Sequence, residues 1–593
     1  MQPHMTESRP ADGSFETQMT ASETAWNLKT RLAFWAVGAV LGFSQAWTFR
    51  LDADDNTITY LDIGNYFFHG HYSAIVNGFW SPMYSLLFGL TMTVFRPSLY
   101  WEYPAVHLIL FAVFLFTMAC FDYFLRQLMQ FRADFEPEDK ISSTPDCVWL
   151  TIGYTIFLWF TLKWSEVNRL TTDLLAAGFF YLSYGLLVKI FSGHTKWRVF
   201  LLLGVTLGLT YLTKFSLLPI CLLILLIAWV VARQNARYVT ISTAVLILIA
   251  APFITALSTQ KGKLTYGEAA TYDYVVSVNR IPRYHWQGDA RMQLVHPTRQ
   301  IFVAPAAFEF KEPFKGTFPP QYDITYWYQG IRPQIHFRQQ LKALARNLRL
   351  EFGTLSFSLS GILLPTLFLA FYETGRGRMV LKDILRYWFL IVPCVATALL
   401  FALVYYIPQY LAGSFVVLLL CLFFSAVITR PGSRLLQGVA VLNVALFAIM
   451  CFPLVLHAFG VHPFHSRGVE RASYEQIADA ALRMGLRPTD QIASVNDSNF
   501  GTSEWAHLIH LQIVAEVPYI SGVPDGDPYD VWNRGWNNFW NADLATQERV
   551  LEKFSQTGAR AVISQDKPIG PGASRWLEIG NTGYYLYWLK PGD

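Results

Sequence analysis

Charge is scarce in this chain: only 15% of its 593 residues are charged, whereas 53% are hydrophobic and 16% are aromatic. Soluble domains carry about 25% charged residues, so this composition excludes a soluble protein of this length. The net charge is only +4, and the basic residues are scattered along the chain. Because nucleic-acid binding needs a clustered basic surface, we expect no nucleic-acid partner.

Cysteine is also sparse, and it is absent from the two large polar regions, 258–350 and 458–593. The six cysteines all lie in or at apolar segments: Cys120, Cys147, Cys221, Cys394, Cys421 and Cys451. This distribution implies no disulfide framework and no Cys/His zinc spacing, and predicts small, buried apolar side chains. No cleavable signal peptide is evident, and the polar residues 1–30 predict a disordered cytoplasmic tail.

Long uncharged runs are abundant, and several reach the roughly 20 residues needed to cross a bilayer. The pattern predicts eleven full spans, near 31–49, 104–127, 147–163, 172–191, 197–213, 215–232, 238–257, 353–373, 385–406, 411–428 and 435–457. The apolar segment 82–95 is short and predicts a half-membrane or interfacial helix. If it crossed fully, making twelve spans, the alternation of inside and outside loops would break by one.

Positive charge sets the expected orientation of these spans. Basic residues mark alternate loops, at 126–140, 196–198, 233–237, 376–386 and 430–434. With these loops inside, the segments 50–80, 258–350 and 458–593 lie outside. The expected location is therefore the inner (cytoplasmic) membrane, with the polar regions on its periplasmic or extracellular side.

The predicted fold class is mainly α: a polytopic transmembrane helical bundle over 31–457, followed by a small extracytoplasmic α/β domain over 458–593. Alternating strand and helix patterns after residue 458 favour that second domain, which shows no Gly-rich phosphate loop. A docking or structural role is the simplest interpretation of it. The long outer loop 258–350 is rich in Tyr, Trp and Pro, as is typical of a lid or a binding element.

The most informative segment is 51–64 (LDADDNTITYLDIG), which places four carboxylates just beyond the first span. An amphipathic, aromatic stretch follows at 60–68, as expected of a helix lying in the interface. A carboxylate beside such an apolar platform acquires a raised pKa, which suits a general base. The alternative is that these carboxylates are simply solvated.

This segment and several others resemble the GT-C superfamily of membrane glycosyltransferases, which includes protein O-mannosyltransferases and the lipid A aminoarabinose transferase; it most closely resembles uncharacterised bacterial members. The resemblance covers about residues 30–430. It is carried by the ordered motifs LDADDNTITY at 51–60, WSPMY at 80–84, RLTTD at 169–173, GLTYLTK at 208–214, HPT at 296–298 and GTFPPQYD at 316–323.

The resemblance implies a sugar donor carried on polyprenyl phosphate, an acceptor reached from the outer side, and inversion at the sugar carbon. The acceptor hydroxyl needs a base, which we assign by position to Asp55, then Asp54, then Asp62. The interval to Tyr60 is one residue longer than usual, so the alignment could instead place Asn56 at the motif position.

The leaving phosphate needs cations, for which Lys214 ranks first and Arg169 second. A lysine snorkelling to the interface is the alternative for Lys214. Asp173 is expected to orient a cation or hold a sugar hydroxyl, with capping of a helix as the alternative, and Glu166 nearby has the same alternatives. In the long loop we expect substrate contacts from His296, Tyr322 and Asp323; a membrane aromatic belt would explain the tyrosines equally well.

One position departs from the family: relatives carry an Arg-Tyr pair near a late span end, where this chain has Gln409 and Tyr410. We retain both as candidate phosphate contacts. The expected function is transfer of a sugar to a glycan, lipid or protein acceptor, in contact with membrane lipids. The alternative is a non-catalytic scaffold or lipid-binding protein on the same fold. Asp54 and Asp55 could hold a divalent cation such as Mg or Mn, which the sequence leaves open.

Overall fold

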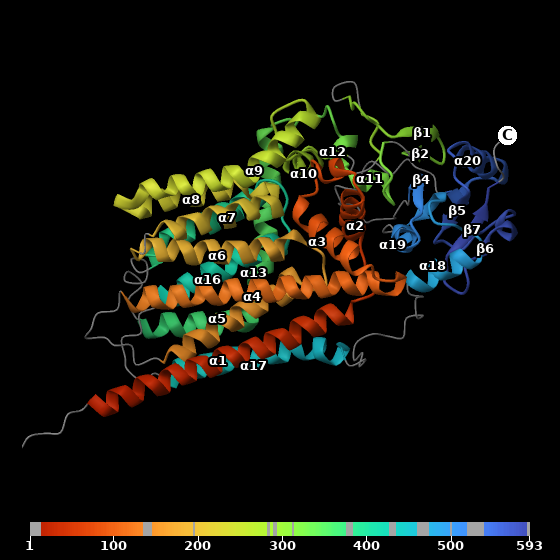
Figure 1. Ribbon diagram of the computed structural model, residues 1–593. Coiled ribbons are helices and arrows are strands. Elements are labelled where there is room, and N and C mark those ends of the chain that lie inside the picture. The colour runs from red at the N-terminus through yellow and green to blue at the C-terminus, as the bar shows by residue number, and fades with distance from the viewer. Residues whose placement is uncertain are drawn as a thin grey trace, which may run out of the picture.

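The computed structural model describes residues 13–134, 145–193, 196–281, 285–288, 293–310, 313–374, 384–425, 434–458, 474–497, 501–518 and 539–589. It combines a bundle of long helices with a mixed β-sheet at one pole of the bundle (Figure 1). Six of the described helical segments are long and apolar enough to cross a membrane. The chain is therefore a multi-pass integral membrane protein.

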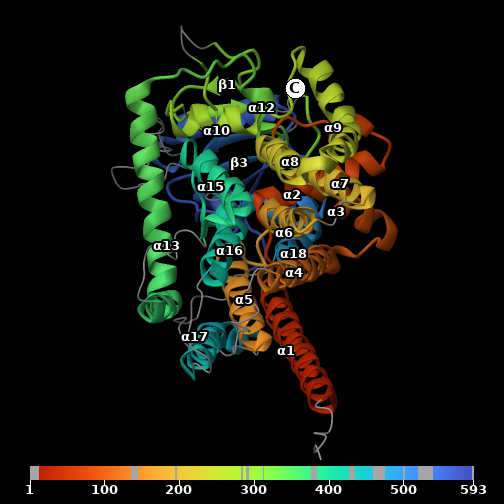
Figure 2. The same ribbon diagram turned by 90° about the vertical axis from the view of Figure 1, so that its left-hand side faces the viewer.

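Each of the eleven expected spans falls on a helix of the bundle. These helices are α1 (Gly13–Thr48), α4 (Glu102–Ala133), α5 (Asp146–Phe160), α6 (Thr172–Phe191), α7 (Trp197–Thr213), α8 (Leu218–Ala232), α9 (Val239–Lys261), α13 (Phe337–Thr374), α15 (Trp388–Ala402), α16 (Pro408–Ser425) and α17 (Arg434–Ala458). The core between them is packed with buried Phe, Tyr, Leu and Ile side chains. Figure 2 shows α13 at the edge of the bundle, where it contacts α15 and α17.

Two helices begin earlier than the hydropathy indicated. Helix α13 starts at Phe337, inside the segment expected to be an outer loop, and α1 starts at Gly13. Residues 13–30, which we expected to be part of a disordered tail, are therefore helical, and residues 1–12 lie outside the described residues. Hydropathy locates only the apolar part of a helix, and a polar helical extension leaves no such signal.

The two short helices at the sheet-bearing pole cross closely. These are α2 (Asp55–Phe68) and α3 (Pro82–Phe95), the latter being the 14-residue apolar segment 82–95. A Cβ atom added at Gly89 would lie 2.6 Å from the carbonyl oxygen of Gly64, and one added at Gly64 would collide with the backbone of Ser85. Glycine at both positions lets the two backbones touch, which fixes the path of α2 across the end of the bundle.

The sheet has the strand order β1-β2-β4-β3-β5-β7-β6. Its centre is parallel: β3 (Gln491–Asp497) pairs with β4 (Gln512–Pro518) and β5 (Ala561–Ser564), and α19 (Gly501–Leu508) and α20 (Leu544–Gln556) lie in the connections. The strands β7 (Tyr585–Trp588) and β6 (Leu577–Glu578) extend one edge in antiparallel fashion. Among the described strands of the C-terminal region this is the alternating α/β pattern expected from the sequence.

The other edge of the sheet comes from the long loop. Strands β1 (Arg299–Phe302) and β2 (Ala307–Glu309) form a hairpin, and β2 pairs with β4. The imidazole of His285 stacks on Phe308 and hydrogen-bonds to Glu516 of β4. The long loop and the C-terminal region therefore share one sheet, which the division of the chain at residue 458 did not foresee.

Candidate functional site

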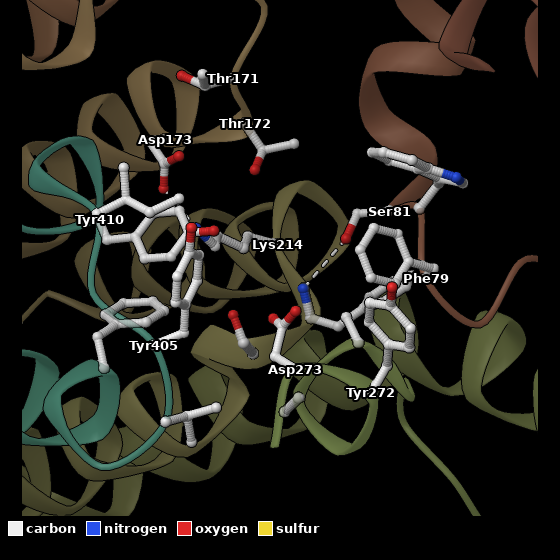
Figure 3. A pocket seen from close by; sticks show the side chains of 18 of the residues that line it. Phe79, Ser81, Thr171, Thr172, Asp173, Lys214, Tyr272, Asp273, Tyr405 and Tyr410 are labelled. Atoms are coloured by element: carbon white, nitrogen blue, oxygen red, sulfur yellow. Dashed lines mark hydrogen bonds and ion pairs between the residues drawn. The ribbon is translucent and has the colours of Figure 1, made fainter. Parts of the chain in front are cut away.

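A cavity of about 360 Å³ opens where the helix ends meet the long loop (Figure 3). Its wall is assembled from α2, the start of α6, the turn between α7 and α8, the short helix α10 (Ala269–Ser277), and the turn between α15 and α16. The polar side chains among its lining residues are Asn56, Tyr60, Ser81, Thr171, Thr172, Asp173, Lys214, Ser216, Tyr266, Tyr272, Asp273, Ser277, Gln321, Tyr405, Gln409 and Tyr410.

Lys214 is the cation at this cavity. It ends α7, and its ammonium lies 2.6 Å from Oδ1 of Asp173 in the first turn of α6. The same ammonium lies 3.4 Å from the centre of the Tyr410 ring and 5.0 Å from that of Phe401. The side chain is 14% exposed, so its charge faces the cavity rather than bulk water. Because solvent screening is weak in such a site, the ammonium attracts an anion placed beside it strongly, while the carboxylate of Asp173 offsets part of that attraction.

The turn that carries Lys214 is held by the segment before α3. The hydroxyl of Ser81 accepts a hydrogen bond from the backbone N–H of Phe215 at 3.2 Å. The amide oxygen of Asn77 accepts from the N–H groups of Phe79 and Trp80, each at 2.9 Å. The motif WSPMY therefore does more than open an apolar helix, because its first residues shape the cavity wall beside Lys214.

Helix α2 contributes Asn56 and Tyr60 to the cavity, whereas Asp54 and Asp55 are not among its lining residues. Asp54 caps α2: its Oδ1 accepts from the N–H and the hydroxyl of Thr57 at 2.8 and 2.6 Å. Its Oδ2 accepts from Nδ2 of Asn56 at 3.2 Å. The half-buried Asp55 accepts at Oδ1 from the N–H of Asn56, at 3.1 Å. At the start of α2, the side chain that lines the cavity is thus the amide of Asn56, which directly follows the carboxylates of Asp54 and Asp55.

Asp62 points away from the cavity, into the contact between the bundle and the sheet region. Its Oδ1 lies 3.0 Å from Nδ1 of His507 on α19, and its Oδ2 accepts from the N–H of Thr317 at 2.7 Å. Nε2 of His507 lies 2.8 Å from Oε1 of Glu102, the first residue of α4. Burial alone would lower the pKa of His507, but the charges of Glu102 and Asp62 and the hydrogen bonds to both raise it to about 10. Asp62 is therefore part of a charged link between domains.

Asp273, which sequence reasoning missed, lines the cavity from α10 (Figure 3), and its charge acts on Lys214. The buried Lys261, which the sequence analysis also did not predict as important, holds the segment at the start of α10. The ammonium of Lys261 lies 3.7 Å from Glu268, 3.3 Å from Asp323 and 3.1 Å from the hydroxyl of Thr325. No local motif marks Asp273; its place follows from the path of the long loop across the mouth of the bundle.

The remaining candidates divide into two groups. Gln409 and Tyr410 line the cavity with Asp173 and Lys214. The side chains of Arg169, Glu166, His296, Tyr322 and Asp323 are not among the lining residues.

Each side chain of the second group has another partner. Exposed Arg169 pairs with Glu166 at 3.3 Å, and the ring of His296 stacks on Tyr326 with centroids 4.2 Å apart. Buried Tyr322 stacks on Phe314 with centroids 4.9 Å apart. Asp323 caps the short helix α12 (Ile324–Trp327) and pairs with Lys261.

The described residues contain no group of three or more His, Cys, Asp or Glu side chains placed to hold a metal ion. At the expected pair, the oxygens of Asp54 accept hydrogen bonds within α2, which uses them for the helix cap. Asp54 and Asp55 therefore support the start of α2, and neither of them lines the cavity.

No family model and no curated protein matches the chain. Its structure is similar to that of ArnT from Cupriavidus metallidurans bound to undecaprenyl phosphate, with a TM-score of 0.50 and 11% identity, over 95% of this chain and 98% of that one. For ArnT from the same organism in the apo state, the TM-score is 0.48 and the identity 12%, over 95% of this chain and 98% of that one. For the Archaeoglobus fulgidus oligosaccharyltransferase in complex with Zn and sulfate, the TM-score is 0.46 and the identity 11%, over 90% of this chain and 67% of that one.

At such low identity the likeness to undecaprenyl-phosphate-bound ArnT shows the fold alone. That fold is a bundle of membrane-length helices with a mixed β-sheet region at one end. The fold class expected from the sequence is therefore confirmed: this chain is mainly helical and has an ArnT-like fold.

Proposed function

We propose that this protein is a glycosyltransferase that moves a sugar from a polyprenyl-phosphate donor to a cell-envelope acceptor, with inversion at the sugar carbon. The observation that carries the proposal is the Lys214–Asp173 ion pair, held at 2.6 Å in the wall of a cavity at the end of the bundle. A lipid phosphate at the membrane edge would meet a buried cation there. The ArnT fold, seen with undecaprenyl phosphate in its own structure, supports this choice of donor.

The donor phosphate is assigned to Lys214, with Gln409 and Tyr410 as neutral partners. As the bond to the sugar breaks, negative charge grows on the phosphate, and a cation held in a weakly screened site stabilises that change. Gln409 lines the same cavity and can donate a hydrogen bond without adding charge. The cavity thus gives the phosphate one fixed positive charge, and Asp173 keeps that charge in place before the donor binds.

The general base is assigned to Asp273 in place of the aspartates at the start of α2. Asn56 presents an amide to the cavity, and an amide cannot take the proton of an acceptor hydroxyl. The carboxylates among the described lining residues are Asp173, in the first turn of α6, and Asp273, on α10. Asp173 holds the ammonium that we assign to the phosphate, so we assign Asp273, on another wall of the same cavity, to the acceptor.

In the proposed step, the acceptor oxygen forms a bond to the anomeric carbon while the bond from that carbon to the phosphate oxygen breaks. The acceptor proton passes to the carboxylate of Asp273, and the bonding pair leaves with the polyprenyl phosphate. The sugar inverts because attack comes from the side opposite the phosphate. The distribution of basic loops favours an outer location for the cavity, since the loops at 196–198 and 233–237 lie at the far ends of α7 and α8.

The test is a transfer assay with the full chain in lipid vesicles, a panel of labelled polyprenyl-phosphate sugars, and envelope acceptors. Asp273→Asn should lower turnover by about 10²–10⁴-fold, the contribution typical of a general base. Asp54→Asn is the matched control, because it keeps most of the cap hydrogen bonding and should change turnover less. If Asp54→Asn abolishes transfer and Asp273→Asn does not, the base lies on α2 after all. A chain that binds donor but transfers none of the sugars would favour a lipid-binding scaffold.

A further inference from the structure

A second hollow, of about 500 Å³, lies on the side of the bundle, away from the candidate site. Its lining residues come from α4, α6 and α7, and α6 packs against both of the other two helices (Figure 1). It is lined by Ala119, Cys120, Tyr123, Leu182, Leu186, Lys189, Arg198, Val199 and Leu202. Because these helices are membrane-length or apolar and Leu202 is 42% exposed, the groove opens toward lipid.

The groove changes from apolar to polar along its length, in the same direction on all three helices. Helices α4 and α6 run away from the sheet-bearing pole, so Tyr123 lies farther from it than Ala119, and Lys189 farther than Leu182. Helix α7 runs back toward Lys214, so Arg198 lies at its far end. A rise of 1.5 Å per residue separates Leu182 from Lys189 by about 10 Å. This is the polarity pattern of an amphiphile, with a headgroup end and a chain end.

The far end of the groove carries two cations, Lys189 and Arg198. Lys189 is half-buried and Arg198 is exposed, and neither has an acidic partner in the part of the chain that the structure describes. In contrast, Arg31 and Arg126 both pair with Asp122, at 2.7 and 3.0 Å. Within the described part of the chain, the charges of Lys189 and Arg198 are thus available to an anion.

We propose that this groove binds an anionic phospholipid, with its phosphate between Lys189 and Arg198 and one acyl chain along Leu186, Leu182 and Leu202. Basic pockets between membrane helices recognise anionic headgroups in this way, since each cation near the surface attracts them. The half-exposed Trp197 beside Arg198 suits the interfacial level expected for such a headgroup. The headgroup end lies opposite the pole that carries Lys214, so this lipid is distinct from the proposed donor.

The test uses the full chain, stripped of lipid in detergent, and native mass spectrometry with phosphatidylglycerol and phosphatidylcholine of matched chains. We expect phosphatidylglycerol to bind at least about tenfold more tightly, and Lys189→Gln/Arg198→Gln to abolish that preference. The control variant Arg233→Gln/Arg237→Gln removes two cations from the next loop at the same end of the bundle, and it should keep the preference for phosphatidylglycerol. Equal binding of the two lipids, or a preference that survives the Lys189/Arg198 double variant, overturns the proposal.

Two further variants separate the groove from simpler explanations. Ala119 is exposed, so Ala119→Phe fills the groove from the lipid side without changing charge, and it should weaken phosphatidylglycerol binding. Full binding by that variant would mean that the cations act without the groove. Lys214→Met should leave phosphatidylglycerol binding unchanged while weakening that of undecaprenyl phosphate. If Lys189→Gln/Arg198→Gln weakens undecaprenyl phosphate instead, the groove serves the donor and the proposal fails.

Discussion

Asp62 and His507 meet across the boundary between the bundle and the sheet region, with Oδ1 of one 3.0 Å from Nδ1 of the other. Asp62 belongs to α2, whose earlier turns bring Asn56 and Tyr60 to the cavity. His507 also contacts Glu102, so one imidazolium joins α2, α4 and α19. The position of a cavity wall therefore depends on how the C-terminal region docks.

This link predicts a pH-dependent stability. The pKa of His507 in the folded protein, about 10, lies above its ordinary value of about 6.5. Its contribution is therefore fully present below about pH 6.5 and is lost as pH rises through about 10. We expect the melting temperature of the wild type to exceed that of His507→Gln at neutral pH, with the gap closing toward pH 10–11. Exposed His336, which takes no part in these contacts, provides the control: His336→Gln should leave the wild-type profile unchanged. A gap between the wild type and His507→Gln that stays constant across this range would refute the link.

The ion pair at the cavity predicts different outcomes for single and double neutralisation. Lys214→Met leaves Asp173 buried without its partner, which should cost about 3–5 kcal/mol of stability. Lys214→Met/Asp173→Asn removes both charges and should recover most of that loss. If Lys214 binds the donor phosphate, both variants should bind undecaprenyl phosphate about 10–100-fold more weakly, as measured by calorimetry in detergent. Recovered affinity in the stable double variant would show that Lys214 serves only the fold.

Much of the bundle was predictable because membrane helices carry their own signal. The uncharged run 172–191 coincides with α6, and Lys214, at a helix end, stood out because a charge there is costly. Gln409 and Tyr410 were placed by a motif position and line the cavity with Lys214. In each case the local sequence holds the information.

The other features depend on distant segments of the chain. Asp273 reaches the cavity because Lys261 anchors the start of its helix, and neither residue stands in a recognisable motif. Asp62 looked like a site carboxylate from its neighbours in sequence, yet its partner His507 comes from the far end of the chain. The hairpin of β1 and β2 is too short to signal a strand pairing with β4. Contacts between segments far apart in the sequence fix these positions, and a short stretch of sequence does not contain both residues of such a contact.

The close crossing of α2 and α3 predicts a steric effect at Gly89. An added methyl group would lie 2.6 Å from the carbonyl oxygen of Gly64, so Gly89→Ala should force the helices apart and cost about 1–3 kcal/mol. Gly353→Ala is the matched control, since a Cβ atom there meets nothing within 4 Å and alanine favours a helix. Thermal unfolding in one detergent compares the two. A Gly89→Ala variant as stable as Gly353→Ala would show that the crossing tolerates a wider separation.

The amide of Asn56 allows the position of the base to be tested by restoring a carboxylate. In the Asp273→Asn background, Asn56→Asp places an acid on the cavity wall, at the alternative motif position left open by the sequence. We expect turnover to recover about tenfold, a fraction of the 10²–10⁴-fold that a base supplies, because the new acid sits on a different wall. Asn56→Ala in the same background opens similar space without an acid and should not recover turnover. Single-turnover rates with saturating donor isolate the chemical step, and equal recovery by both variants would exclude proton transfer as the cause.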